Sequence, residues 1–139
     1  MTKKNVEPIA NIIFDSKNKV TFPVLMAAME ENGINPYGDL DYLSRQIKNC
    51  IYWRGLSQDA LDILDAIQKF YRVTLQPYGY NPEGVRFYKE KFPDMPVFNH
   101  FLIEKMKPAT QKKFMSVPYM MPVYFVPTKD AVYIQKPGC

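Results

Sequence analysis

Residues 57–72 read SQDALDILDAIQKFYR and carry the clearest helical pattern in the chain. The apolar residues of this stretch recur at the spacing of one buried helix face: Ala60, Ile63, Leu64 and Ile67. Ser57 is suited to the N-cap position, because its hydroxyl can accept a hydrogen bond from an amide of the first turn. We therefore predict a helix over this stretch, with the rest of the chain packed around it.

The composition indicates one globular domain. The chain has 139 residues, of which 47% are apolar and 23% charged, and this balance is too apolar for a disordered protein. No apolar run reaches the ~18 residues of a membrane span, and the N-terminus leads into no signal-peptide core. The two cysteines, Cys50 and Cys139, form no disulfide framework. We expect a cytoplasmic protein with reduced thiols and no membrane partner.

The net charge of +4 is unevenly distributed along the chain. Residues 1–40 carry four Lys and Arg against five Asp and Glu, and residues 41–72 carry five against four. Residues 73–139 carry nine against five, so the basic excess lies in the C-terminal half. A surplus of this size permits an anionic partner without the dense basic stripe of a typical nucleic-acid-binding protein.

The N-terminal half is expected to be helical after residue 20. Residues 1–8 are read as a polar tail, and Ile9–Phe14 as a short strand or an incomplete helix. A first helix is predicted from Thr21 to Gly33, with Pro23 in its first turn and Gly33 ending it. A second is predicted from residue 39 to Gly55, so that residues 21–72 form a unit of three helices. The single tryptophan, Trp53, is expected to wedge helices together at the last junction.

The C-terminal half is predicted to combine helices with a hairpin. Residues 73–116 are expected to be mainly helical, with one helix starting at Asn81-Pro82 and another capped by Asp94. Residues 119–136 are predicted to form a β-hairpin around a loop at 128–130, with a third strand from Ile9–Phe14 or Val73–Leu75. The expected fold is α+β: one mainly helical domain of about five helices with a small antiparallel C-terminal sheet.

Catalytic and metal-binding residues are sparse. The only histidine is His100, and no third group beside it and Cys50 supports a nucleophilic dyad. The six glycines are too dispersed for a phosphate-binding loop. The acids Asp59, Asp62 and Asp65 step along one helix and are read as a solvated face. We therefore predict a protein that is not an enzyme and has no cofactor and no metal.

A helix-turn-helix regulator of transcription is one alternative. The two predicted helices over residues 21–54 are joined by a turn that contains glycine, and the second offers side chains that read bases or hold phosphates: Ser44, Arg45, Gln46, Lys48 and Asn49. The turn is long and contains Pro36, and Asp39 and Asp41 would bring negative charge to the DNA. These features weaken the alternative.

A second alternative is a single-stranded nucleic-acid binder that uses residues 69–91. Aromatic and basic residues alternate in this stretch, and exposed rings beside cations bind bases and phosphates. The same rings at helical spacing are more economically core residues. As a protein-binding surface we select aromatic, methionine and basic residues of the C-terminal half: Tyr78, Tyr80, Arg86, Lys89, Tyr119, Met120 and Tyr124.

These features resemble, at the level of a class, the small accessory proteins of phages and mobile elements, including anti-CRISPR-type inhibitors. The likeness consists of a short, aromatic-rich chain without catalytic machinery. It implies a protein that inhibits or regulates a protein or nucleoprotein machine by occupying the partner's surface, with nucleic acid as a second class of partner.

Overall fold

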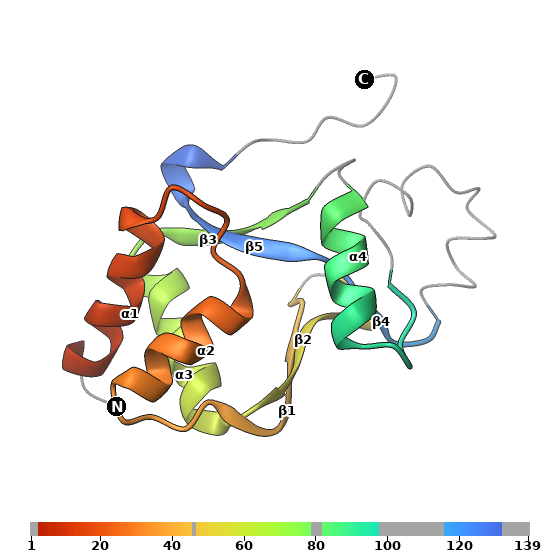
Figure 1. Ribbon diagram of the computed structural model, residues 1–139, viewed down its shortest axis with the longest axis horizontal. Coiled ribbons are helices and arrows are strands. Elements are labelled where there is room, and N and C mark those ends of the chain that lie inside the picture. Colours follow the sequence, from red (N-terminus) through yellow and green to blue (C-terminus); the bar gives the residue numbers. More distant parts are fainter. Residues whose placement is uncertain (1–2, 46, 79–81, 98–115, 132–139) are drawn as a thin grey trace. The chain divides into compact units, whose positions relative to one another are not determined.

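The computed structural model describes residues 3–45, 47–78, 82–97 and 116–131. Within these ranges the fold is mixed α+β, and the elements follow one another along the chain as Figure 1 shows. The helices are α1 (Lys3–Asp15), α2 (Phe22–Glu31), α3 (Gln58–Phe70) and α4 (Pro82–Lys91), with a 3-10 turn at Thr128–Asp130. The strands are β1 (Tyr37–Leu43), β2 (Cys50–Leu56), β3 (Val73–Pro77), β4 (Tyr119–Met120) and β5 (Val123–Pro127). They form one sheet of order β1-β2-β4 and a second that pairs β3 with β5.

The described residues divide into two compact units. The first unit contains residues 3–41, 54–76 and 124–131, and the second contains the described parts of 42–53 and 77–123. The strands β1 and β2 each continue from one unit into the other.

The first unit is built on α3, where the sequence predicts the structure correctly. The Ser57 hydroxyl accepts a hydrogen bond from the amide of Ala60 at 3.1 Å and caps the helix. Ile63, Leu64 and Ile67 are almost completely buried. The helix α1 contacts both α2 and α3 (Figure 1). Burying each of these large aliphatic side chains contributes ~1.5–3 kcal/mol, so the three helices form the core of the unit.

The first unit also contains the β3–β5 sheet. Phe125 of β5 packs edge-on against Phe22 at the start of α2, with ring centroids 4.9 Å apart. An isolated antiparallel bridge joins Phe125 to Val20. These contacts hold β5 beside the segment that leads into α2.

The second unit is held together by an aromatic cluster beneath α4. Trp53 of β2 lies 5.4 Å from Tyr88 and 4.7 Å from Phe92 between ring centroids, both edge-on. The Tyr88 hydroxyl donates a hydrogen bond to the Tyr52 carbonyl oxygen at 2.7 Å. Tyr88 is 1% exposed, so this hydroxyl is satisfied inside the unit and fixes α4 to β2.

Parallel pairing between β2 and β4 completes the second unit. Cys50 is opposite Tyr119, and Ile51 is opposite Met120. These four residues are buried. The pairing joins segments about 70 positions apart in the chain.

The predicted fold class is wrong in three respects. The helix expected from residue 39 to Gly55 does not form, because this stretch is the β1–β2 strand pair. The strands therefore lie in the middle of the chain, and Trp53 is a strand residue rather than a wedge between helices. The C-terminal hairpin is also absent from the described residues: β5 pairs with β3. Most of the second strand of that predicted hairpin, at 131–135, lies outside the described residues.

Two further segments differ from expectation. The predicted polar tail and short apolar run are one helix, α1, which buries Val6, Ile9, Ala10 and Ile13 and contains Pro8. Asp94 lies in a turn, in which the Met95 amide donates to the Phe92 carbonyl oxygen, and it starts no helix before the described range ends at residue 97. In contrast, α2, α3 and α4 begin within two residues of their predicted starts.

Candidate protein-binding surface

The strand segment Tyr37–Asp41 of the first unit exposes two large hydrophobic side chains close together in the chain. We call this segment the β1 edge. Tyr37 is 59% exposed and Leu40 is 38% exposed, although aromatic and leucine side chains in strands usually pack against a neighbour. Within the described strands, β2 is the only partner of β1, so β1 forms the end of its sheet.

The backbone of the β1 edge presents hydrogen-bonding groups to solvent. Because the connection from β1 to β2 has only six residues, the two strands are antiparallel. At one end the Ser44 amide donates to the Cys50 carbonyl oxygen, and at the other the Pro36 carbonyl oxygen accepts from the Ser57 amide. Between these two bonds β1 advances by eight residues and β2 by seven, so the pairing shifts by one residue along β1.

Side-chain contacts hold the β1 edge in place. The Arg54 Nε atom of β2 lies 3.1 Å from the Asp41 Oδ1 atom, where it donates a hydrogen bond within an ion pair. The Tyr37 amide donates to the Asn35 side-chain oxygen at 3.1 Å. A hydrogen bond to the Glu30 carboxylate raises the pKa of the Tyr37 hydroxyl above its usual value. The strand therefore enters the sheet from a fixed turn.

Glycine at position 38 allows β1 to approach the chain beyond β2. A Cβ atom placed on Gly38 would lie 2.7 Å from the Leu56 carbonyl oxygen and 2.8 Å from the Ser57 Cα atom. Both neighbours are backbone atoms and cannot rotate away. Gly55 has a φ of +82°, in the left-handed region that favours glycine, and turns the chain at the same place.

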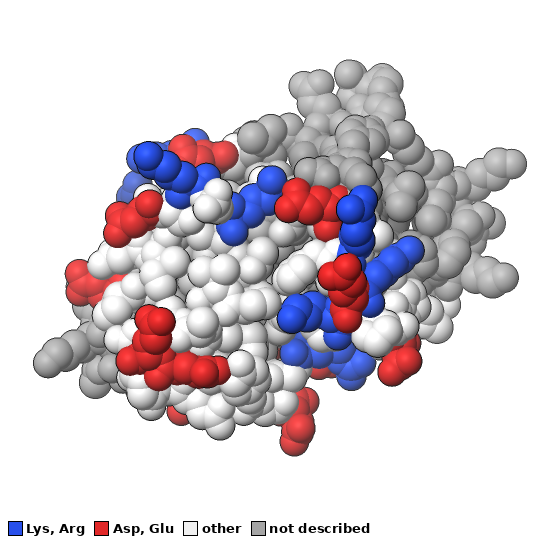
Figure 2. Space-filling model, viewed as in Figure 1, with Lys and Arg blue, Asp and Glu red and all other residues white. Residues whose placement is uncertain are grey.

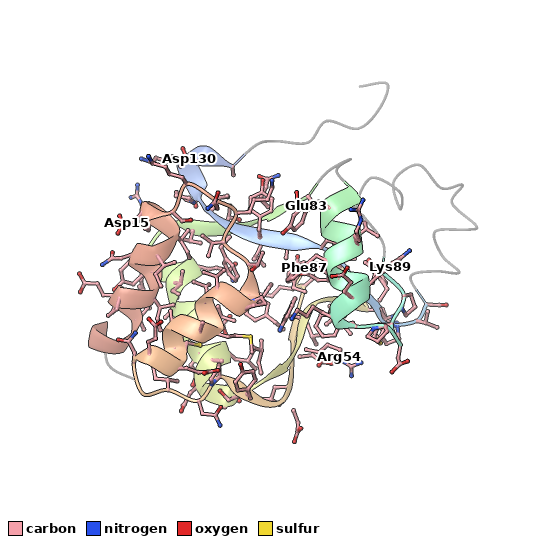
Figure 3. All side chains as sticks on the ribbon, in the orientation of Figure 1. Asp15, Arg54, Glu83, Phe87, Lys89 and Asp130 are labelled. Carbon is pink, nitrogen blue, oxygen red and sulfur yellow. The ribbon has the colours of Figure 1, made fainter. Side chains whose placement is uncertain are left out.

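The predicted binding residues of α4 lie on a mixed-charge face. Arg86 and Lys89 are exposed, but Glu83 and Glu90 are exposed on the same helix. Figure 2 shows basic and acidic side chains intermixed over α4. Figure 3 shows Phe87 and Lys89 on opposite sides of the helix, with Phe87 stacked on Trp53 at 6.0 Å. This face has the character of a solvated helix surface.

The other predicted binding residues are placed less favourably. Tyr119 and Met120 are 0% exposed and belong to the core of the second unit. Tyr124 is half-buried in the first unit, with the Lys19 ammonium group 5.6 Å from its ring centroid. Tyr78 is half-buried, and its ring lies where a Cβ atom on Gly84 would stand. Tyr80 lies outside the described residues.

The helix required by the helix-turn-helix alternative is absent, because its sequence forms β1 and β2. Ser44, Arg45, Lys48 and Asn49 lie in the connection between these strands, where Asn49 has a φ of 63°, and Gln46 lies outside the described residues. The Ser44 hydroxyl accepts a hydrogen bond from the Ile47 amide and so stabilises this turn. The described part of residues 37–56 therefore supplies no recognition helix to enter a DNA groove.

The single-stranded nucleic-acid alternative needs exposed rings. Among the described rings of residues 69–91, only Phe70 is exposed, at 69%. Tyr88 is buried, and Phe87 is half-buried against Trp53. Apart from Phe70, the described rings of this stretch are therefore buried or half-buried, which does not favour a stacking platform.

Of the two candidate nucleophilic or basic residues, Cys50 and His100, the structure describes Cys50 alone. Cys50 is 1% exposed, and burial raises the pKa of its thiol to about 12, so the thiol stays protonated at neutral pH. Burial, together with the neighbouring Cys50 thiol, also raises the pKa of the Tyr119 hydroxyl. His100 lies outside the described residues. Asp59, Asp62 and Asp65 are exposed, and within the described part of the chain no three His, Cys, Asp or Glu side chains are grouped to hold a metal ion.

The sequence interpretation missed the β1 edge. Leu40, Leu43 and Ile47 match helical spacing, and this agreement hid the alternation of Asp39, Leu40 and Asp41. The aromatic and β-branched run Ile51-Tyr52-Trp53 was the available signal for a strand. Once β2 is recognised as a strand, the segment before it can be predicted as the strand that pairs with it, β1.

No protein-family model, curated protein or solved structure matches this chain. Among the helices of the described residues, none combines the length and the apolar character needed to cross a membrane.

Proposed function

We propose that this chain is a non-enzymatic binding protein that inhibits or regulates a protein or nucleoprotein machine by occupying part of its surface. The observation that carries the proposal is the β1 edge, an exposed strand at the end of a sheet with an aromatic and an aliphatic side chain in solvent. Soluble proteins usually cover or blunt such edges. An edge strand that exposes an aromatic and an aliphatic side chain is a typical docking site for another chain.

The distribution of exposed apolar residues supports this assignment. Seven large hydrophobic residues are exposed among those the structure describes, and three of them belong to β1: Tyr37, Leu40 and Leu43. One strand of seven residues thus carries nearly half of them. Tyrosine and leucine gathered on one element favour a protein partner over a nucleic acid, which requires cations and exposed rings together.

The proposal keeps two expectations from the sequence, a class of protein and a cellular compartment. A short binder without catalytic groups is similar to the accessory inhibitors of phages and mobile elements, of which anti-CRISPR proteins are one type. We place it in the cytoplasm, because the buried Cys50 is a free thiol, which suits a reducing compartment.

The test is affinity capture with surface variants. Tagged wild type and a Tyr37→Ala variant are used to capture partners from a lysate treated with nuclease, at about 50 and 200 mM salt. Wild type should retain a stoichiometric protein at both salt concentrations, and Tyr37→Ala should recover at least about fivefold less of it. Purified partner should then be inhibited or altered in activity by wild type and not by the variant.

Phe70→Ala is the matched control, because Phe70 is also an exposed ring of the first unit and lies on α3, at 69% exposure. It should bind the partner as wild type does. Capture of nucleic acid alone, or equal loss for Tyr37→Ala and Phe70→Ala, would overturn the proposal.

A further inference from the structure

Basic side chains gather at one end of the first unit. We call residues 14–19, 69–72 and 128–130 the basic end, and its five cations are all exposed: Lys17, Lys19, Lys69, Arg72 and Lys129. The same ranges contain two acids, Asp15 and Asp130, so their net charge is +3. The other described residues of the first unit carry three Lys and Arg against eight Asp and Glu, a net charge of −5. The unit is therefore strongly polarised.

Backbone hydrogen bonds bring the three segments of the basic end together. The Thr128 amide donates to the Arg72 carbonyl oxygen at 2.8 Å, and the Phe125 amide donates to the Val20 carbonyl oxygen at the same distance. The chain from β5 onward is thus bonded both to the segment after α3 and to the segment before α2. Figure 2 shows the basic side chains gathered where α1 ends and the 3-10 turn lies. Cations from three distant parts of the sequence therefore form one surface.

The helix α3 separates the basic end from the β1 edge. The Ser57 hydroxyl caps the start of α3 and donates to the Asn35 carbonyl oxygen just before β1. The helix then runs for 13 residues to Phe70, which at 1.5 Å per residue is roughly 20 Å. Binding at the basic end is therefore independent of the docking proposed for the β1 edge.

Arg72 occupies a position in the basic end that usually belongs to glycine. It follows Tyr71, the C-cap of α3, and has a φ of 52°, in the left-handed region. Any residue with a Cβ atom is strained in this conformation, and strain of this kind is concentrated at functional sites. The Arg72 side chain is exposed, so what it contributes lies on the surface rather than in the core.

Exposed rings accompany the cations. The helices α1 and α3 each carry a phenylalanine in their last two residues, of which Phe14 is 44% exposed and Phe70 is 69% exposed. The Lys69 ammonium group lies 5.3 Å from the Phe70 ring centroid. Single-stranded nucleic acid is bound by cations that hold phosphates beside rings on which bases stack. We propose that the basic end binds single-stranded nucleic acid, with a base stacked on Phe70 and the basic side chains on the phosphodiester groups.

An acidic protein segment is the other polyanion that would suit five cations. Its carboxylates would use the cations and leave the two phenylalanine rings in solvent, whereas bases would cover them. The rings therefore favour nucleic acid. Residues 69–91 by themselves lack this arrangement, because Phe14 and three of the five cations come from the other two segments.

Fluorescence anisotropy with a labelled oligothymidine of about 15 nucleotides tests the binding. At about 50 mM salt the dissociation constant should be micromolar, and it should rise about twenty- to hundredfold at about 200 mM, as three to five phosphate contacts require. Lys17→Gln combined with Lys129→Gln should weaken binding at least about tenfold. Arg86→Gln combined with Lys89→Gln removes the same charge from the exposed face of α4 and should bind as wild type does. Equal losses for the two double variants would overturn the inference.

The ring separates nucleic acid from other polyanions. Phe70→Ala should weaken oligothymidine binding about fivefold or more, because a stacked base is lost. A poly-glutamate peptide of about the same charge should bind more weakly than oligothymidine and be unaffected by Phe70→Ala. Poly-glutamate binding as tight as that of oligothymidine, or oligothymidine binding that ignores Phe70→Ala, would assign the surface to an acidic protein and overturn the inference.

Arg72→Gly separates binding from stability. It should weaken oligothymidine binding about three- to tenfold through the lost phosphate contact. The melting temperature should stay the same or rise, because glycine adopts the left-handed conformation without strain. A variant that melts at a lower temperature and binds as wild type does would show that Arg72 is structural and would overturn the inference.

The two surfaces are tested apart. Tyr37→Ala should bind oligothymidine as wild type does, and Lys17→Gln with Lys129→Gln should capture the protein partner normally from nuclease-treated lysate. Because nuclease removes the nucleic acid, Phe70→Ala remains a control for protein capture. If oligothymidine is not bound but capture depends on Tyr37, the proposed function stands and the inference is wrong. If Tyr37→Ala loses no partner, the proposed function itself fails, whatever the oligonucleotide does.

Discussion

Ser57→Ala tests how the organising helix and the β1 edge depend on one hydroxyl. The Ser57 Oγ atom accepts from the Ala60 amide at 3.1 Å and donates to the Asn35 carbonyl oxygen at 2.7 Å. The first bond caps α3, and the second fixes the turn that leads into β1. Alanine removes both bonds while leaving the bond from the Ser57 backbone amide to Pro36 in place.

The expected cost follows from these two bonds. Replacing a serine N-cap by alanine costs ~1 kcal/mol. The bond to Asn35 is exposed, so water replaces part of it and its net contribution is about 0.5 kcal/mol. Adding these two contributions, we expect the free energy of unfolding to fall by about 1–2 kcal/mol.

Urea unfolding followed by far-UV circular dichroism measures this change, with the slope m held equal for the two proteins. Ser16→Ala is the matched control, because the Ser16 hydroxyl also makes two hydrogen bonds, at 3.0 and 3.2 Å, but to an exposed turn at Asn18. We expect this control to change stability by less than about 0.5 kcal/mol. If Ser57→Ala costs no more than Ser16→Ala, the cap does not stabilise α3 as argued.

Three further predictions concern single contacts. Tyr88→Phe should lower the free energy of unfolding by about 1–2 kcal/mol in urea, because it deletes the 2.7 Å bond to the Tyr52 carbonyl oxygen and keeps the ring; an unchanged midpoint would contradict this role. Gly38→Ala should cost more than about 1 kcal/mol and reduce partner capture, because its Cβ atom must displace the backbone at Leu56; wild-type stability and capture would contradict the close approach. Burial raises the pKa of the Cys50 thiol to about 12 from its usual 9.0, so unfolding releases a proton in this range and stability should fall as pH rises from 9 to 12. The slope should reach up to about 1.4 kcal/mol per pH unit from this thiol, and a Cys50→Ala variant with the same pH dependence would refute the assignment.

The candidate site could be predicted only in part. The sequence placed Arg86 and Lys89 on a helix, and both are exposed there. We predicted Tyr119 and Met120 as binding residues because of their residue types, but both pair with β2 and are buried. Residue type alone does not distinguish an interface tyrosine from a core tyrosine, because both positions favour a large ring.

The helix α1 shows a pattern that was present in the sequence and passed over. Val6, Ile9, Ala10 and Ile13 recur at helical spacing and are all buried. Pro8 made a polar tail the simpler interpretation, since proline removes one helical hydrogen bond. The contacts of α1 with α2 and α3 offset that loss.

Local chemistry by itself determined α2, α3 and α4. Pro23 at the start of α2, Gly33 beyond its end and the Ser57 cap each act within a few residues of their own position. For such elements the interactions that decide the structure are contained in the stretch itself, so the sequence predicts them.

The secondary structure of residues 37–56 was decided by tertiary contacts alone. Leu40, Leu43 and Ile47 satisfy helical spacing, but Cys50 and Ile51 are buried strand residues that pair with Tyr119 and Met120, about 70 positions away. A strand gains its hydrogen bonds and its burial from a partner strand, whereas a helix makes its bonds internally. Among the described strands, β2 is paired with both β1 and β4, and no local pattern in the sequence records either pairing.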